Sequence, residues 1–133
     1  MSIRVAVIED NRADTLLVRD ALRFADLDFE LREIPDAEQA GAYLEEIGAG
    51  GDCPDVVILD LNLPRGDGAD VLAQLRASPR CADVPVVLIT SSDSPIDRAR
   101  VAEATRARYF RKPLELDAFL KLGNVVREML ESA

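Results

Sequence analysis

Histidine and tryptophan are absent from this chain of 133 residues, and cysteine occurs only twice. Without histidine, and with Cys53 and Cys81 outside any CxxC or CxxH pattern, the sequence offers no ordinary zinc site. We therefore expect both cysteines to be structural thiols in a reducing cytoplasm, which fits better than a disulfide or a metal site.

Positive charge and long apolar runs are also scarce. The chain has 16 Lys and Arg residues against 25 Asp and Glu residues, and its net charge of −9 argues against DNA or an anionic membrane as the main partner. No apolar run approaches the roughly 18 residues that a membrane helix needs, and no signal-peptide pattern opens the chain. These absences favour a cytoplasmic protein that binds neither nucleic acid nor membrane.

The chain does contain a regular alternation of two hydrophobic patterns. Short apolar runs predict strands at residues 3–9, 29–34, 56–60, 86–89 and around 109–110. Helical patterns follow them at residues 13–25, 36–48, 71–79, from 94 onward and at 116–130. Strict alternation implies a parallel sheet covered on both faces. We expect an α/β, flavodoxin-like doubly wound sheet of five strands in the order 2-1-3-4-5 with five helices, in one domain spanning residues 1–133 with no output domain.

Local signals refine three of these helices. The inner face of the first helix is predicted to carry apolar residues, namely Leu16, Leu17, Ala21, Leu22 and Phe24. Asp36, followed three residues later by Gln39, predicts a capped start for the second helix. Ser94 and Pro95 predict the start of the fourth helix, as a cap residue and a proline at the first helical position.

Polar residues follow the apolar strands at the points where those strands end. Glu9 and Asp10 follow the first strand, and Asp60 closes the third. The fourth strand ends at Thr90, and Lys112 follows the fifth. Because the carboxyl ends of parallel strands share one edge, we expect these side chains to meet in the crevice where open α/β sheets bind ligands.

Three neighbouring carboxylates repel one another by roughly 4 kcal/mol per pair at about 4 Å and an effective dielectric near 20. One interpretation is that Glu9, Asp10 and Asp60 are separate, solvated loop acids. The other is that a hard divalent cation such as Mg²⁺ compensates the repulsion and leaves positions free for a phosphoryl oxygen. Beside such an ion, Asp60 is suited to attack phosphorus and form an acyl phosphate.

Lysine is rare in this sequence, because 14 of the 16 basic residues are Arg. A lysine at position 112, directly before Pro113, therefore indicates a need for the compact charge of an ammonium group instead of the planar guanidinium of arginine. The competing interpretation is a solvated surface lysine, and Thr90 taken alone is an ordinary β-branched residue at the end of a strand.

Together these residues resemble the receiver domain of bacterial two-component response regulators. The resemblance covers essentially the whole chain and is carried by Glu9-Asp10, by LDLNLP at residues 59–64 with Gly66 and Gly68, by Thr90-Ser91 and by Lys112-Pro113. The LNLP sequence and the long loop after the second helix look most like stand-alone receivers of the phytochrome-associated type.

The resemblance implies a role for each residue. Asp60 would accept a phosphoryl group from a sensor histidine kinase, in this subfamily a phytochrome-type photoreceptor. Mg²⁺ would be held by Glu9, Asp10, the Asp60 carboxylate and the backbone carbonyl of Asn62. Lys112 would pair with the phosphoryl group and Thr90 would donate a hydrogen bond to it. Tyr109 stands at the position of the family's switch aromatic, with a half-buried strand tyrosine as the alternative. The resemblance also implies a cis Lys112–Pro113 bond.

Other functions fit the sequence less well. An aspartyl-phosphate phosphatase of the haloacid dehalogenase class resembles DxDx(T/V), but position 62 is Asn and not the second Asp. A flavodoxin-like flavin protein would need ring-stacking aromatics, and neither Tyr43 nor Tyr109 follows a suitable strand. A pseudo-receiver that signals without phosphorylation is disfavoured by the intact acids, Thr90 and Lys112. We therefore expect a signalling switch, and no enzyme acting on other substrates.

The stretch from Arg98 to Lys112 is basic in an otherwise acidic chain, with Glu103 as its only acid. One interpretation is a solvated helix face. The other is a basic contact surface for a partner's acids, including those of a second copy in a homodimer.

Overall fold

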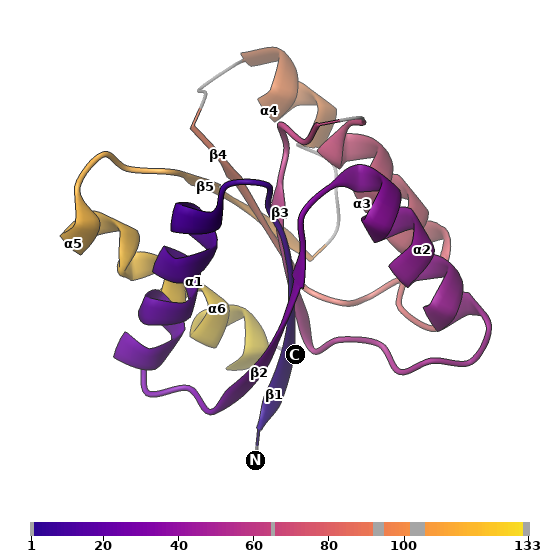
Figure 1. The fold of residues 1–133 in the computed structure, drawn as a ribbon, viewed down its shortest axis with the longest axis horizontal. Coiled ribbons are helices and arrows are strands. Elements are labelled where there is room, and N and C mark those ends of the chain that lie inside the picture. Colours follow the sequence, from indigo (N-terminus) through magenta and orange to yellow (C-terminus); the bar gives the residue numbers. More distant parts are fainter. Residues whose placement is uncertain (1, 65, 92–94, 102–105, 132–133) are drawn as a thin grey trace.

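The computed structural model describes residues 2–64, 66–91, 95–101 and 106–131, apart from the side chains of residues 97, 100 and 101. Five parallel strands form one sheet in the order β2-β1-β3-β4-β5, as expected (Figure 1). The strands are β1 (Ile3–Ile8), β2 (Phe29–Ile34), β3 (Val56–Asp60), β4 (Val86–Thr90) and β5 (Ala107–Arg111). Every residue of β3 and β4 is buried, because helices cover both faces of the central strands.

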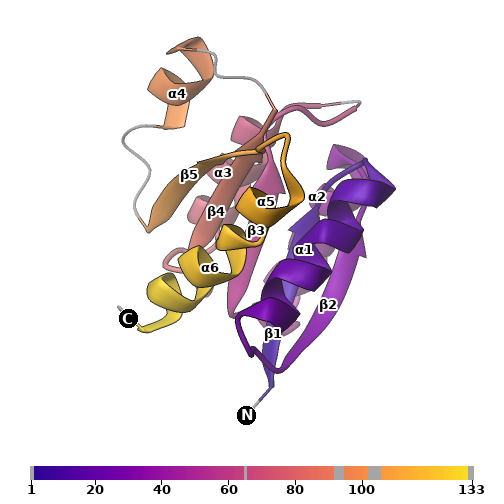
Figure 2. The ribbon, with the colours of Figure 1, turned by 90° about the vertical axis from the view of Figure 1, so that its left-hand side faces the viewer.

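The helices divide between the two faces of the sheet. They are α1 (Arg12–Phe24), α2 (Ala37–Gly48), α3 (Gly68–Ala77), α4 (Pro95–Val101), α5 (Leu116–Phe119) and α6 (Lys121–Glu131). Figure 2 shows α1, α5 and α6 in front of the sheet, and one apolar core lies between these helices and the strands. The second core lies on the opposite face, under α2 and α3.

Three details of the helices differ from the prediction. Leu16 is 45% exposed and Phe24 is 67% exposed, so neither lies on the inner face of α1. That face consists of Thr15, Val18, Ala21 and Leu22, whose spacing is helical and excludes positions 16 and 24. The last helix is not continuous but is divided at Leu120 into α5 and α6.

The cap predictions have two outcomes. Asp36 caps α2 by accepting a hydrogen bond from the Gln39 amide at 2.8 Å, which confirms that prediction. Ser94 lies outside the described residues. Asn11 provides a cap for α1 by accepting from the amides of Ala13 and Asp14.

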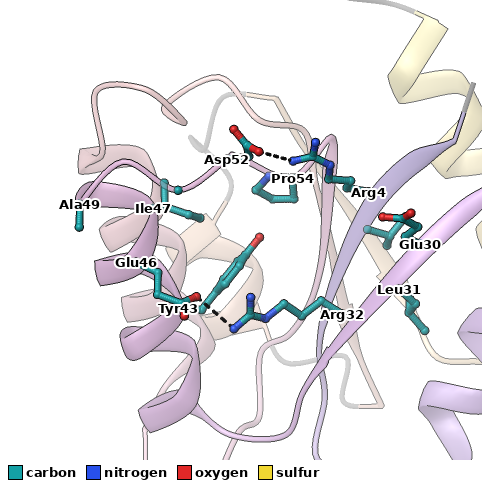
Figure 3. Close-up of a pocket in the computed structure, with 12 residues that line it drawn as sticks. Arg4, Glu30, Leu31, Arg32, Tyr43, Glu46, Ile47, Ala49, Asp52 and Pro54 are labelled. Atoms are coloured by element: carbon teal, nitrogen blue, oxygen red, sulfur yellow. Dashed lines mark hydrogen bonds and ion pairs between the residues drawn. The ribbon is translucent and has the colours of Figure 1, made fainter.

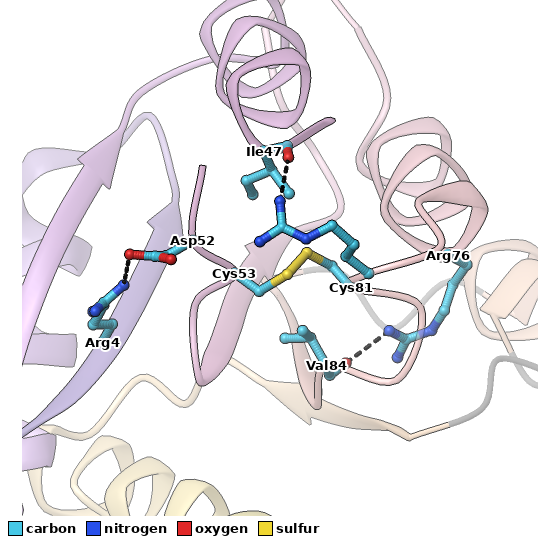
Figure 4. The surroundings of a disulfide bond; sticks show 8 residues. Arg4, Ile47, Asp52, Cys53, Arg76, Cys81 and Val84 are labelled. Atoms are coloured by element: carbon cyan, nitrogen blue, oxygen red, sulfur yellow. Dashed lines mark hydrogen bonds and ion pairs between the residues drawn. A yellow bond between two sulfur atoms is a disulfide. The ribbon is translucent and has the colours of Figure 1, made fainter. Parts of the chain in front are cut away.

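The expectation of two free thiols is wrong, because Cys53 and Cys81 form a disulfide (Figure 4). Their Cα atoms are 5.8 Å apart although the residues are 28 positions apart in the sequence. The bond joins the loop before β3 to the segment between α3 and β4. That proximity comes from tertiary packing and has no local sequence signal.

None of the helices in the described part of the chain is long and apolar enough to cross a membrane.

Candidate functional site

The register of the sheet brings the carboxyl ends of four strands to one edge. Ile8 pairs with Leu59, so the residues that follow them, Glu9 and Asp60, stand side by side. Asp60 in turn neighbours Ile89 on β4, and Thr90 pairs with Arg111 on β5. The predicted acids, hydroxyl and lysine are therefore gathered at the same edge, as the strand order implies.

The three predicted acids form a cluster. Each of Glu9, Asp10 and Asp60 offers one carboxylate oxygen, and these oxygens lie within 4.8 Å of one another. Glu9 and Asp60 are 4% exposed, whereas Asp10 is exposed. The interpretation of three separate, solvated acids is therefore wrong, because two of them are buried against each other.

Backbone amides fix the orientation of the two buried carboxylates. The Asn11 N–H donates to Glu9 Oε1 at 3.0 Å, and the Asn62 N–H donates to Asp60 Oδ1 at 2.8 Å. Both are charge-assisted hydrogen bonds, which favour the ionised carboxylate. The second oxygen of each carboxylate is consequently directed toward the centre of the cluster.

Lys112 supplies the positive charge of the site, as predicted, and the competing interpretation of a solvated surface lysine is wrong. Its side chain is 10% exposed, and its ammonium lies 2.7 Å from Glu9 Oε2, 2.8 Å from Asp14 Oδ2 and 3.1 Å from Asp60 Oδ2. The contacts to Asp14 and Asp60 are hydrogen bonds, and the contact to Glu9 is an ion pair. Burial opposes the charge of Lys112, but these carboxylates outweigh it and raise the pKa of Lys112.

Glu9 is the acid whose protonation the fold changes most clearly. Burial raises the pKa of Glu9 from 4.5 to about 7, and Asp60 adds to this effect by repulsion. Lys112 and the Asn11 amide act in the opposite direction without cancelling it. Without a divalent metal ion, the site therefore holds one carboxylate that the fold keeps partly protonated near neutral pH.

Thr90 is fully buried at the end of β4. Its hydroxyl oxygen accepts a hydrogen bond from the Asn62 side-chain amide at 2.7 Å, and its backbone carbonyl accepts from the Lys112 amide at 2.7 Å. Asn62 thus joins Asp60 and Thr90, through its backbone on one side and its side chain on the other. The proposed use of the Asn62 carbonyl as a metal ligand stays a prediction.

A cavity of about 470 Å³ opens beside Asp10 and Asn62, and residues 61–64, 66 and 67 line the rest of it. The exposed carboxylate of Asp10 and the exposed side chain of Asn62 give access to the buried pair behind them. Three carboxylates beside this opening form a donor set that suits a hard divalent ion surrounded by oxygen.

Asp14 is the residue that the sequence analysis missed. It lies in the first turn of α1, is 22% exposed and contacts Lys112 across a sequence separation of 98 residues. Its position four residues after Asp10 was the available signal. An acid in the first turn of a helix is ordinarily explained by the helix dipole, which is why it did not stand out.

Two further expectations concern the segment around β5. Tyr109 is half-buried and its ring lies beneath the Arg98 guanidinium, 4.7 Å from the ring centroid. Arg108 pairs with Glu128 at 2.7 Å. Lys112 belongs to the buried site, so it is not part of a basic contact surface. Glu103 and the side chain of Arg100 lie outside the described residues, and the role of the remaining basic residues stays a prediction.

The prediction of a cis Lys112–Pro113 bond is wrong. The described backbone contains no cis peptide, and this bond is trans. The Lys112 ammonium reaches the cluster from the trans chain, so the turn that the resemblance implied is not required to aim it.

A cavity of about 640 Å³ lies away from this edge, between the first two strands and α2 (Figure 3). Both of its arginines are paired within the cavity: Arg4 contacts Asp52 at 3.0 Å and Arg32 contacts Glu46 at 3.1 Å. The Arg32 guanidinium also lies over the Tyr43 ring at 4.6 Å. Because both arginines are already paired, this cavity offers weaker chemistry than the cluster around Asp60.

Comparison with known proteins agrees with this geometry. The family model of the response regulator receiver domain matches residues 5–123. Response regulator Rcp1 of Synechocystis sp. is 32% identical over 120 residues, which cover 89% of this chain and 82% of Rcp1. The structure of the phosphorylated cyanobacterial phytochrome response regulator RcpA is similar with a TM-score of 0.87 at 28% identity, over 100% of this chain and 97% of RcpA. The Mn²⁺-bound form of Rcp1 gives 0.84 at 30% identity, over 98% and 96%.

Proposed function

The chain belongs to the response regulator receiver domain family of two-component signalling, and from this premise we propose that Asp60 is its phosphoacceptor. In this proposal Asp60 takes a phosphoryl group from a sensor histidine kinase in a Mg²⁺-dependent reaction. Residues 1–133 then act as one receiver domain that signals through protein contacts.

The observation that carries the proposal is the placement of Asp60 Oδ2. It is 3.1 Å from the Lys112 ammonium, while Oδ1 is held by the Asn62 amide at 2.8 Å. A carboxylate oxygen attacks phosphorus, the bond from phosphorus to the donor breaks, and an acyl phosphate forms. The cation at 3.1 Å is near enough to offset the negative charge that the phosphoryl oxygens bring into a buried site.

The other residues of the cluster support the same chemistry. Glu9, Asp10, the Asp60 carboxylate and the Asn62 carbonyl are the oxygens that would hold Mg²⁺, and the ion would supply charge neutralisation for the incoming phosphoryl group. Divalent metal is bound in the structure of Rcp1 named above. Thr90, whose hydroxyl oxygen accepts from the Asn62 side-chain amide, would donate its O–H to the phosphoryl group, and we propose that Tyr109 responds to this contact.

The chain has no histidine of its own, so a phosphohistidine that donates to Asp60 has to belong to another protein. We propose a histidine kinase, and within that class a phytochrome-type photoreceptor, since the similar RcpA is a phytochrome response regulator. A kinase that uses ATP implies a cytoplasmic location for this chain. We also propose that the chain can form homodimers. The Cys53–Cys81 disulfide is unusual for a cytoplasmic protein, so the redox state of these two cysteines in cells tests the proposed location.

The decisive experiment is intact-mass analysis after incubation with acetyl phosphate and Mg²⁺. We expect one phosphoryl adduct in the wild type, none without divalent metal and none in Asp60→Asn. Asp20→Asn is the matched control, because Asp20 is an exposed acid on α1 and should be modified like the wild type. An adduct that persists at full level in Asp60→Asn would remove Asp60 from its role, and a wild type that stays unmodified would favour a pseudo-receiver.

A further inference from the structure

Asp14 shares the Lys112 ammonium with the two buried acids of the proposed phosphoacceptor site. An ammonium has three donors, and here three different carboxylates surround it, at 2.7 Å (Glu9), 2.8 Å (Asp14) and 3.1 Å (Asp60). Asp14 does not belong to the cluster of acids that can hold a metal ion. It comes from α1, whereas Glu9 and Asp60 follow the central strands.

The three carboxylates would not interact equally strongly with Lys112 once the site binds a metal ion and a phosphoryl group. In the proposed function, Glu9 and Asp60 face a divalent cation, which gives them a second positive partner. Asp14 stands outside that set, and within the described residues the structure records no other ion pair for it. The Lys112 ammonium would then interact mainly with Asp14 and with the phosphoryl group.

We propose that Asp14 is a positioning residue that competes with the phosphoryl group for Lys112, and so sets how strongly the receiver holds that group. This inference rests on the proposed function and adds a regulator to the same site. Asp14 Oδ2 and Asp60 Oδ2 contact the same nitrogen, so they lie within about 6 Å of each other. At that separation a fixed negative charge opposes a second anion on Asp60 as well as drawing the ammonium away from it.

Asp14→Asn tests this competition because the amide keeps the shape of the side chain and one acceptor oxygen but loses the charge. Binding of beryllofluoride in the presence of Mg²⁺, followed by fluorine NMR, reports the strength of the phosphoryl subsite without chemistry. We expect Asp14→Asn to bind beryllofluoride roughly tenfold more tightly than the wild type. Asp20→Asn removes the same charge from an exposed position on the same helix and should change the affinity less than about twofold.

A second arm separates competition through Lys112 from a general change in charge. In a Lys112→Gln background, Asp14→Asn should give a clearly smaller gain in beryllofluoride affinity, because the shared cation is gone and only the direct repulsion between Asp14 and the bound anion is relieved. Urea denaturation in EDTA gives a readout that needs no ligand: Asp14→Asn and Lys112→Gln should be non-additive if the ion pair exists in solution.

The outcomes are distinct. If the wild type binds beryllofluoride and Asp14→Asn binds it equally or more weakly, the competition is refuted while the proposed function stands. An equal gain in the Lys112→Gln background, or additive effects on unfolding, would also refute the role through Lys112. A wild type that binds no beryllofluoride and forms no Asp60 adduct refutes the proposed function itself.

Discussion

Replacing Glu9 by glutamine should stabilise the metal-free protein at high pH and leave its stability unchanged at low pH. The fold buries this carboxyl completely and raises its pKa from 4.5 to about 7. Between these two values the folded state binds a proton that the unfolded state has released. The Glu9 contribution to stability is therefore fully present below pH 4.5 and is lost as the pH rises through 7.

The size of the effect follows from that shift. Each pKa unit corresponds to about 1.4 kcal/mol, so ionisation of Glu9 at pH 8 costs the folded state roughly 3 kcal/mol relative to the protonated form. Glutamine resembles the protonated form and does not ionise, so the folded variant is not destabilised in this way. We expect Glu9→Gln and the wild type to unfold with similar free energies near pH 4.5, and the variant to be roughly 3 kcal/mol more stable at pH 8.

Urea denaturation in EDTA, followed by circular dichroism across this pH range, measures the difference. Glu45→Gln is the matched control, because Glu45 is an exposed glutamate on α2 and its removal should give no comparable pH dependence. Saturating Mg²⁺ should reduce or reverse the advantage of Glu9→Gln, because the wild type gains a bound ion that the variant holds less well. A difference between Glu9→Gln and the wild type that does not grow with pH would refute the burial argument.

Three further predictions test other parts of the structure. Asp10→Asn should raise the melting temperature of the metal-free protein by relieving repulsion worth about 1–3 kcal/mol, and should weaken Mg²⁺ binding measured by calorimetry. A variant that melts lower and binds Mg²⁺ normally would contradict the cluster. Reducing the Cys53–Cys81 disulfide should lower the free energy of unfolding by about 3–4 kcal/mol, in line with its 28-residue separation. The stability of Cys53→Ala should not change with reductant, and a wild type that is equally stable with and without reductant would argue against the bond. Gly123→Ala should destabilise the fold by about 1–3 kcal/mol, because a Cβ at this position meets the backbone carbonyl of Ala21 where α6 packs on α1. Thermal denaturation measures this change, and unchanged stability would show that the packing is looser than described.

Much of the site could be derived from the sequence because its residues are tied to strand ends. Glu9, Asp10, Asp60 and Thr90 each follow or close an apolar run, and a parallel sheet in the observed order brings those ends to one edge. Lys112 needed a second signal, its rarity among arginines. The same local signals located the α2 cap at Asp36, since capping is decided within one turn of helix.

The sequence by itself therefore determined the alternation of strands and helices, the buried central strands and the acids at their ends, because hydrophobic periodicity acts over a few residues. Only the tertiary structure decided which distant groups meet. Asp14 reaches Lys112 across 98 residues, and Cys53 reaches Cys81 across 28, and local spacing does not specify the partner in either case. The apolar character of Leu16 and Phe24 predicts that both lie on the inner face of α1, yet both are exposed. The rotation of a helix on its sheet is set by the packing of its neighbours, and that information is spread over the whole chain.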